Sequence, residues 1–354
     1  MTDAHRLDPP PGFWVRALYA CLQIFWRRRP PLAEPPQRIL IVRPDRRVGN
    51  LLITTALVKS LRTHLPDAQV DMVVPSDRAQ MLQGLEEIDH LHAFDQRDWL
   101  RPWKLLAWAR RLRSLQYDLV LDASHWHTHS ATAGILCRLV GGRWVVGSAG
   151  PGPKLADYSV PLDLPVDGRW PSELVMKTRL LRPIGIEEEH PEMLCPLGQR
   201  PEDRAAAKQW WGQQAGEARS VLLWLTTRKS STFLDAERWV QALDVLPEWR
   251  DAVFGIGWGP GDEKLLADAI KVLEEKGVKA VALPPTSLDA LAAYMLEADV
   301  VLSGDTGPLH LARSLRRPIV AFFRVGDGGR WCPTGHHIRR FSWGQDCFQE
   351  QWDQ

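Results

Sequence analysis

Residues 298–323 have the sequence ADVVLSGDTGPLHLARSLRRPIVAFF. The apolar run at residues 300–302 predicts a fully buried parallel strand. A turn cluster at residues 304–308 follows it, and a short helix is predicted over residues 309–315. A proline then ends the helix before a second predicted strand, at residues 319–323. This order of strand, tight loop, helix and strand predicts an α/β protein with a parallel sheet.

The loop of this unit carries the first candidate site, which consists of Asp305, Thr306, Gly307, Pro308 and His310. The first N–H groups of a helix lack partners within the helix and carry partial positive charge, so they favour an anion or a sugar hydroxyl. The Asp305 carboxylate can itself accept hydrogen bonds from a sugar. In the alternative interpretation, Asp305 and Thr306 only cap the helix while Gly307 and Pro308 shape the turn. Local chemistry leaves both interpretations open.

The same stretch resembles the D-T/S-G-P-x-H-L-A segment of the family 9 glycosyltransferases, which include the bacterial lipopolysaccharide heptosyltransferases. Residues 321–337, AFFRVGDGGRWCPTGHH, are similar to that family's strand, loop and R-W-x-P-x-G tail. Further similarity begins at residue 38, so the resemblance covers roughly residues 38–340. It implies an α/β GT-B fold, in which two Rossmann-like doubly wound domains face a central cleft.

Length and composition set the outer bounds. A chain of 354 residues with 45% hydrophobic and 25% charged residues is typical of a soluble globular protein with two domains. A net charge of +1 gives no general attraction to nucleic acid. The five cysteines are scattered without metal-ligand spacing, so free thiols are expected, and the histidines at 125, 127 and 129 do not form a recognised metal motif. No metal and no resident cofactor are therefore predicted.

The N-terminal region, residues 1–36, is predicted to be a tail with an amphipathic segment. Residues 13–26, FWVRALYACLQIFW, precede three arginines, Arg27 to Arg29. The apolar stretch is too short to span a bilayer, but aromatic residues beside arginines suit the surface of an anionic membrane. The other interpretation is a helix that packs on the domain and leaves its basic end in solvent.

The first domain is expected over residues 37–185 and, by resemblance, on the acceptor side. An apolar strand at 38–42 leads into a loop at 43–50 and then a helix at 51–64. Further strands are predicted at 70–74, 117–121 and 144–146, with helices at 76–85, 103–114 and 171–181 and a loop at 150–170. Alternating strands and helices predict a parallel sheet, which binds ligands at the carboxyl ends of its strands.

The second domain is expected over residues 186–340, followed by a tail at 341–354, and the resemblance implies that it binds the nucleotide sugar. Arg228 and Lys229 follow a predicted strand at 221–225 and are candidates for binding the diphosphate. The GWGPGDE loop ending at Glu263 is similar to the family's G-G-P-x-E loop. The resemblance implies that Glu263, or alternatively Asp262, binds the nucleotide ribose.

The loop after the first strand departs from the family pattern at one catalytic position. The family has Gly-Asp there, with the Asp implied as general base, whereas this chain has Gly49-Asn50. An amide cannot accept a proton usefully near neutral pH. Asp45, five residues earlier in the same loop, is the candidate base, with Asn50 positioning a hydroxyl. Alternatively, Asp45 is only a turn residue or helix cap, and Asp122 or the histidines that follow it act as the base. Neighbouring arginines are expected to lower the pKa of Asp45. The acceptor-binding candidates are Arg46, Arg47, Asp122 and His125.

The expected function is transfer of a sugar, with inversion and without metal, most simply heptose from ADP-heptose to a lipopolysaccharide inner-core acceptor. The enzyme is expected in the cytoplasm, at the inner face of an anionic membrane, with a glycolipid acceptor as partner. Alternatives are another nucleotide-sugar donor, a protein acceptor, or a binding module that has lost its base.

Overall fold

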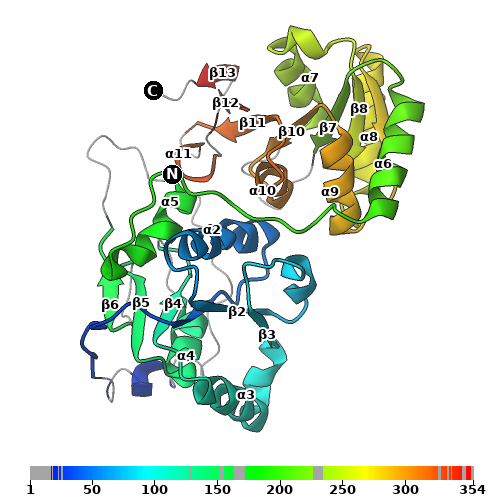
Figure 1. Cartoon of the computed structure of the whole chain (residues 1–354). Coiled ribbons are helices and arrows are strands. Elements are labelled where there is room, and N and C mark those ends of the chain that lie inside the picture. Colours follow the sequence, from blue (N-terminus) through cyan, green and yellow to red (C-terminus); the bar gives the residue numbers. More distant parts are fainter. Residues whose placement is uncertain are drawn as a thin grey trace.

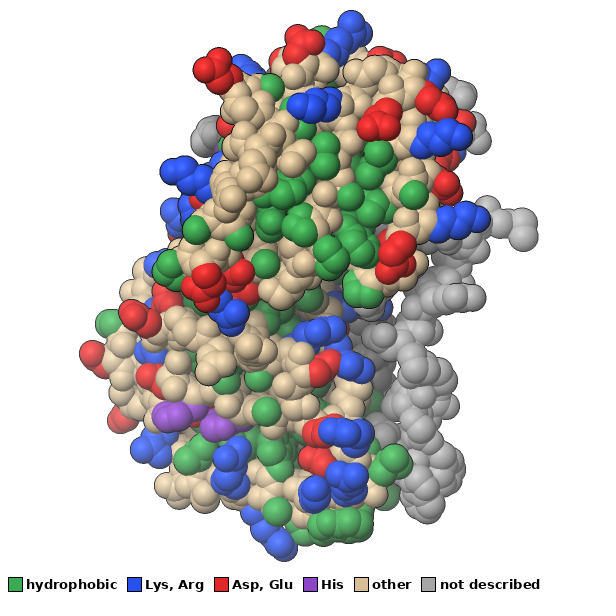
Figure 2. Space-filling view, turned by 90° about the vertical axis from the view of Figure 1, so that its right-hand side faces the viewer, with side chains coloured by type: hydrophobic (Ala, Val, Ile, Leu, Met, Phe, Trp, Pro, Cys, Tyr) green, Lys and Arg blue, Asp and Glu red, His purple; other side chains and the backbone are tan. Residues whose placement is uncertain are grey.

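The computed structural model describes residues 17, 19–22, 24, 27–126, 130–150, 155–162, 172–225, 234–325, 328–332, 335, 337–344 and 348–351. These residues form two α/β lobes, one above the other in Figure 1, and Figure 2 shows the same lobes from the side. Each lobe is built on its own sheet. The described part of the chain contains no helix with the length and apolarity that a membrane crossing requires.

The lower lobe holds a six-stranded parallel sheet in the order β3-β2-β1-β4-β5-β6. Its strands are β1 (Arg38–Val42), β2 (Gln69–Pro75), β3 (His90–Phe94), β4 (Leu119–Asp122), β5 (Trp144–Ser148) and β6 (Tyr158–Val160). Its helices are α2 (Val48–His64), α3 (Pro102–Ser114), α4 (Ala131–Val140) and α5 (Glu173–Thr178), with the 3-10 helices η1 (Ala79–Leu82), η2 (Gln96–Leu100) and η3 (Arg179–Ile184). The strands β2 and β3 are added on one side of β1, and β4 to β6 on the other. This topological switch point between β1 and β4 is where such sheets bind ligands.

The upper lobe holds a seven-stranded sheet in the order β13-β12-β11-β10-β7-β8-β9, in which only β13 is antiparallel to its neighbour. Its strands are β7 (Ser220–Trp224), β8 (Val253–Gly257), β9 (Lys279–Ala282), β10 (Val300–Gly304), β11 (Ile319–Arg324), β12 (Ile338–Trp343) and β13 (Phe348–Gln351). Its helices are α6 (Pro201–Gln214), α7 (Ala236–Asp244), α8 (Glu263–Glu275), α9 (Leu288–Glu297), α10 (Gly307–Ser314), α11 (Gly328–Trp331) and the 3-10 helix η5 (Pro247–Trp249). The switch between β10 and β7 places the loop after β10 at the ligand-binding position.

The predicted pair of doubly wound parallel sheets is confirmed, and the differences concern short elements. The helix predicted at residues 76–85 is wrong, because β2 continues to Pro75 and only the 3-10 helix η1 follows. The loop predicted at 150–170 contains the edge strand β6. Within the predicted tail, residues 341–343 complete β12 and residues 348–351 form β13.

The two lobes meet through α2, which packs against α10 and α5. One buried apolar cluster runs from Ile41 through Leu52 to Leu309 and Ile319, and so crosses from one sheet to the other. The closest approach is at Gly49, where a Cβ atom would lie 2.6 Å from Cδ2 of His310. Because no real Cβ approaches a carbon so closely, glycine at this position is what allows the two helices to meet.

Candidate active site

Two helix starts from different lobes converge at the ends of β1 and β10. A Cβ atom on Gly307, the first residue of α10, would lie 3.6 Å from Cβ of Val48 and 3.8 Å from the backbone nitrogen of Gly49 at the start of α2. Neither helix carries an acidic residue in its first turn. The partial positive charges of both helices therefore add in one place, which suits a diphosphate.

The two helix starts differ in their capping. Thr306 caps α10, because its Oγ1 accepts a hydrogen bond from the backbone N–H of Leu309 at 3.4 Å. The Thr306 hydroxyl also lies 2.9 Å from that of Ser303. The α2 start has no side-chain cap. Capping thus falls to Thr306 rather than to Asp305, whose carboxylate is half-buried in the same loop.

Asp45 lies in the loop that follows β1, three residues before the start of α2. Its Oδ1 accepts from the backbone N–H of Arg47 at 2.9 Å, and its Oδ2 accepts from Nη2 of Arg43 at 3.0 Å. The Asn50 side-chain amide donates to the same Oδ2. Asn50 thus orients the Asp45 carboxylate, and the two residues predicted for catalysis form one unit.

A second carboxylate, Glu173 of α5, lies behind this unit and holds His125. The Nδ1 atom of His125 lies 2.7 Å from Oε1 of Glu173, and its Nε2 lies 2.9 Å from Nη2 of Arg43. Since the guanidinium can only donate, Nε2 is the acceptor and Nδ1 carries the proton that Glu173 accepts. Glu173, His125, Arg43 and Asp45 therefore form a continuous chain of hydrogen bonds.

The loop after β4 is fixed from below by two buried cations. Arg43 donates to the carbonyl of Ala123 at 2.5 Å, and Lys177 donates to the carbonyl of Ser124 at 2.6 Å. Lys177 also lies 3.2 Å from Glu173, one helical turn away on α5. These contacts set the position of His125, the next residue of the loop.

Electrostatics keep the two carboxylates ionised and the imidazole neutral. Burial raises the pKa of Asp45, but the Arg43 charge and the Arg47 N–H outweigh it and lower the pKa well below its usual range. The sequence predicted this direction from the neighbouring arginines. Burial likewise opposes ionisation of Glu173, yet Lys177 and His125 lower its pKa to about 2. The pKa of His125 is lowered by burial and by the charge of Arg43.

The upper lobe reaches into this network through Arg330 of α11. Its guanidinium lies 3.4 Å from Oε2 of Glu173 and between the rings of Trp126 and Trp331, at 4.7 and 4.6 Å from their centroids. The Trp331 ring in turn lies 5.5 Å from that of His125. Burial lowers the pKa of Arg330 to about 10, so the side chain stays charged at neutral pH. The network is therefore complete only when both lobes are in place.

Three further predicted residues differ in their surroundings. His310 is buried and its ring lies 6.3 Å from that of Trp331, so it belongs to the converging site. Asp122, at the end of β4, accepts from the backbone N–H of Ser124 at 3.0 Å and lines a small cavity with His125. Arg46 is exposed, and its Nε donates to Asp77 at 2.8 Å.

Outside the α10 loop, the predicted donor-binding residues are Glu263 with its alternative Asp262, and the pair Arg228 and Lys229. Glu263 is exposed at the start of α8, where its Oε1 accepts from the backbone N–H of Gly261 at 3.3 Å. Asp262 accepts instead from Gly259 at 3.2 Å. Arg228 and Lys229 lie outside the described residues.

Sequence reasoning did not select Glu173, Lys177 and Arg330 as site residues. Glu173 and Lys177 are spaced as an ordinary surface ion pair on a helix, and nothing local indicates that both are buried. Arg330 and Trp331 lie within the R-W-x-P-x-G segment that carried the resemblance, and this was a usable signal. Only the fold brings Arg330 to Glu173, 157 residues away in sequence.

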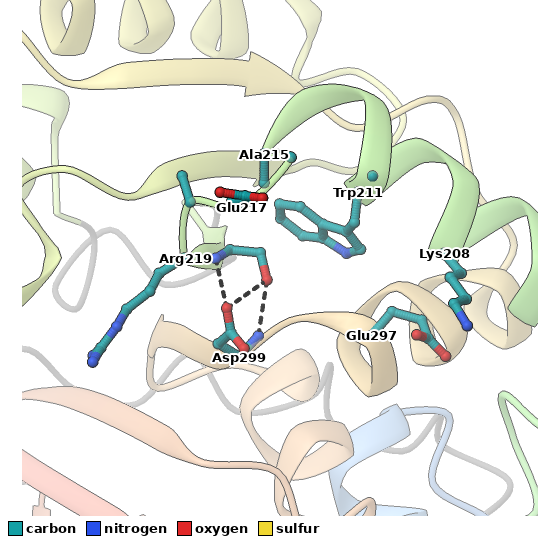
Figure 3. A pocket seen from close by; sticks show the side chains of 11 residues that line it. Lys208, Trp211, Ala215, Glu217, Arg219, Glu297 and Asp299 are labelled. Atoms are coloured by element: carbon teal, nitrogen blue, oxygen red, sulfur yellow. Dashed lines mark hydrogen bonds between the residues drawn. The ribbon is translucent and has the colours of Figure 1, made fainter.

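A larger recess in the upper lobe lies away from this site. It has a volume of about 480 Å³, and Lys208, Trp211 and Arg219 are among the residues that line it (Figure 3). The recess is at the amino ends of β7 and β10, the edge opposite to the helix starts. Its Asp299 accepts from the N–H and hydroxyl of Ser220 at 2.7 and 3.0 Å, which ties the two strands together. Those bonds give this carboxylate a structural role.

Comparison with known proteins agrees with this geometry. The chain is 21% identical to lipopolysaccharide heptosyltransferase 3 of Escherichia coli K12 over 306 residues, which cover 83% of this chain and 84% of that protein. Among solved structures, a family 9 glycosyl transferase from Veillonella parvula matches with a TM-score of 0.70 at 17% identity, covering 88% of each chain. The E. coli heptosyltransferase WaaC with ADP matches with a TM-score of 0.62 at 18% identity, covering 86% of this chain and 93% of that one.

These structural matches confirm the GT-B fold expected from the sequence. The model of glycosyltransferase family 9 (heptosyltransferase) matches residues 105–353, well over half of the chain. The matched region includes His125, Glu173, the α10 start and Arg330, whereas Asp45, Asn50 and the α2 start precede it. The chain therefore belongs to glycosyltransferase family 9.

Proposed function

We propose that the enzyme transfers heptose from ADP-heptose to a lipopolysaccharide inner-core acceptor, with inversion and without a metal ion. The observation that carries the proposal is the convergence of the α2 and α10 starts beside the ionised Asp45. The names of its relatives, a lipopolysaccharide heptosyltransferase and a heptosyltransferase solved with ADP, support the donor and the acceptor class. The alternative is a family member with another nucleotide-sugar donor or a protein acceptor.

The donor binds on the side of the second domain, residues 186–340 in this proposal. The diphosphate faces the starts of α2 and α10, where the unpartnered N–H groups stabilise the charge that develops as ADP departs. Arg228 and Lys229 add positive charge, and Glu263 binds the ribose. Asp305 faces the sugar, while Pro308 and His310 shape the pocket wall.

The acceptor binds on the side of the first domain, residues 37–185, near Arg47, Asp122 and His125. Its hydroxyl attacks the anomeric carbon, the carbon–oxygen bond to the diphosphate breaks, and the hydroxyl proton passes to Asp45. The lowered pKa makes Asp45 a modest base. This is sufficient when the proton leaves late, after positive charge has developed on the sugar ring. Asn50 keeps one carboxylate oxygen aimed at that hydroxyl.

The donor assignment is tested by a binding screen of nucleotide sugars, followed by turnover with the best ligand. Asp305→Ala then separates the roles within the donor site. Because its carboxylate faces the sugar, the substitution should weaken ADP-heptose binding much more than ADP binding in calorimetry. Thr306→Ser keeps the capping hydroxyl and is the matched control. Equal losses for both ligands in Asp305→Ala would contradict the sugar-facing role.

The acceptor class also suggests where the enzyme works. A lipid-linked acceptor is reached at the cytoplasmic face of the inner membrane, and the described part of the proposed tail contacts the acceptor-side domain. Among its described residues, Tyr19 packs with Ala131 and Leu155 of that domain, and the backbone N–H of Arg29 donates to Asp157 at 3.0 Å. Leu22 of the amphipathic segment also packs against this cluster, as expected for a helix that packs on the domain. Trp14, Leu18 and Phe25 of the same segment lie outside the described residues.

A further inference from the structure

The described chain exposes six large hydrophobic side chains, and three of them lie within seven residues of each other. Leu100 is 85% exposed, Trp103 66% and Leu106 45%. Leu100 ends η2, and the other two lie in the first two turns of α3. Single exposed hydrophobic residues are ordinary, but a tryptophan between two leucines on one surface marks an interaction site.

Packing within the domain does not require these three side chains. The α3 helix turns Leu105, Ala109 and Leu112 inward, at the spacing of one helical face. Trp103 lies on the opposite face, at the position where a solvent-facing helix normally carries a polar residue. The neighbouring tryptophans anchor the segment, since Trp99 and Trp108 both contact Phe94, with ring centroids 6.0 and 5.5 Å apart. The exposed trio therefore stands on a fixed support.

Exposed basic residues lie beside the trio and farther along α3. Arg101 and Lys104 alternate with the trio in sequence, while Arg110, Arg111 and Arg113 lie in the last two turns of the helix, and all five are exposed. The acidic residues of the segment are Asp95, which pairs with Arg97 at 2.7 Å, and Asp98. Because the whole chain has a net charge of only +1, this is a local concentration of charge. In Figure 2, Lys and Arg side chains likewise prevail among the charged groups toward the lower end of the molecule.

The position of the trio relates it to the candidate active site. η2 follows β3 directly, so Leu100 and the start of α3 lie at the carboxyl edge of the sheet, the edge that also carries Asp45 and His125. Trp99 also joins the apolar cluster of Tyr19, which connects the surface to the N-terminal segment. On that segment Ile24 is 76% exposed, and Arg27 and Arg28 are exposed as well.

We propose that Leu100, Trp103 and Leu106, with Arg101 and Lys104 between them, dock this domain onto an anionic lipid membrane. The hydrophobic trio enters the region between headgroups and acyl chains, and the arginines and lysine contact lipid phosphates. The proposal rests on the proposed function, because a lipid-linked acceptor gives the docking its purpose. Charge complementarity favours an anionic membrane over a second copy of this nearly neutral chain.

Vesicle sedimentation tests the proposal with the full chain. Leu100→Ser/Trp103→Ser/Leu106→Ser should lower binding to phosphatidylglycerol-containing vesicles by roughly tenfold or more, because all three apolar side chains that would enter the membrane are lost. The same variant should fold normally, since all three side chains are exposed. Arg101→Glu/Lys104→Glu should also weaken binding, and more so at low salt. Arg250→Glu/Lys276→Glu, the same charge reversal at exposed positions of the other domain, is the matched control.

Each outcome decides the proposal. Wild-type binding to anionic vesicles, lost in the two surface variants and kept in the control, supports it. Binding by the Ser variant equal to that of wild type, or no wild-type binding at all, overturns it. Self-association in sedimentation velocity that the Ser variant abolishes, without any vesicle binding, assigns the surface to a second copy and also overturns it. Turnover of ADP-heptose with a lipid-free acceptor saccharide, equal in all variants, separates failure of docking from failure of the proposed function.

Discussion

Two buried carboxylates of the first domain, Asp71 and Glu173, contact histidines in contrasting settings. Asp71 lies on β2, next to the edge strand β3, and is fully buried. Its carboxylate has Tyr117 Oη at 2.6 Å, Gln69 Nε2 at 3.0 Å, His90 Nδ1 at 3.1 Å and His92 Nε2 at 3.2 Å. All of these partners come from the same sheet or its edges. Burial opposes ionisation of Asp71, but these hydrogen bonds lower its pKa to about 2.

Glu173 lies at the ends of the strands, and two of its three partners are cations. It contacts His125 at 2.7 Å and Lys177 at 3.2 Å within its own domain, and Arg330 at 3.4 Å from the other domain. The Asp71 cluster is therefore complete once one sheet has formed, whereas the Glu173 cluster also depends on the position of the second domain. A buried carboxylate that contacts histidine thus stabilises the sheet at Asp71, whereas at Glu173 it aligns the candidate active site.

The largest expected effect comes from Glu173→Gln, which leaves the buried Lys177 and Arg330 without their counter-charge. Loss of one partner in a buried ionic cluster costs about 3–5 kcal/mol. We expect a loss of stability in chemical denaturation together with a fall in kcat, because His125 and Arg43 lose their alignment with Asp45. Glu192→Gln is the control, since Glu192 pairs with Arg316 at the surface and should cost less than about 1 kcal/mol. A normal kcat in Glu173→Gln would remove the difference between the two clusters.

The next effect is expected from Asp71→Asn, which removes the charge that Gln69, His90, His92 and Tyr117 contact. Charge-assisted hydrogen bonds contribute roughly 1.5–3 kcal/mol each, and the amide keeps part of them, so the free energy of unfolding should fall by about 2–3 kcal/mol. The kcat should stay within about twofold, because Asp71 touches no part of the candidate active site. A fall in the kcat of Asp71→Asn as large as that of Asp45→Asn would contradict this separation, because it would show that the sheet interior affects the candidate site.

The smallest effect concerns pH. The folded pKa of Asp71, about 2, is below its ordinary value of 3.8, so its stabilisation is present above pH 4 and is lost as pH falls through the folded pKa. The free energies of unfolding of wild type and Asp71→Asn should therefore differ by about 2 kcal/mol at pH 6 and converge near pH 2. Denaturant melts at several pH values provide the measurement. A constant difference across this range would mean that Asp71 does not stabilise the fold through its charge.

Much of the fold follows from local patterns, and the exceptions have a physical cause. The buried central strands, such as β1 and β10, are continuous apolar runs and were predicted. The strands β3 and β6 lie at the two sheet edges, where burial is incomplete. Their sequences, HLHAF and YSV, accordingly lack a long apolar run. Edge strands are specified by their neighbours more than by their own residues.

The candidate site divides in the same way. Asp45, Asn50 and the Asp305–His310 loop follow strands directly, so strand-end reasoning found them. Glu173 reaches His125 across 48 residues and Arg330 across 157, and such partners depend on tertiary packing that no local pattern encodes. Arg46 was predicted to bind the acceptor, and its guanidinium pairs with Asp77, just after the neighbouring strand β2.

The central claim is that Asp45, oriented by Asn50 and held ionised by its cationic neighbours, accepts the proton in sugar transfer. Turnover of Asp45→Asn and Asn50→Asp with ADP-heptose and the inner-core acceptor tests it most directly, once both variants are shown to fold. Loss of a general base costs roughly 10²–10⁴-fold in kcat, and we expect a fall of this size in Asp45→Asn. Asn50→Asp should give no gain, because a second carboxylate beside Asp45 disturbs its alignment. Near-normal turnover in Asp45→Asn, or a large gain in Asn50→Asp, would contradict the account.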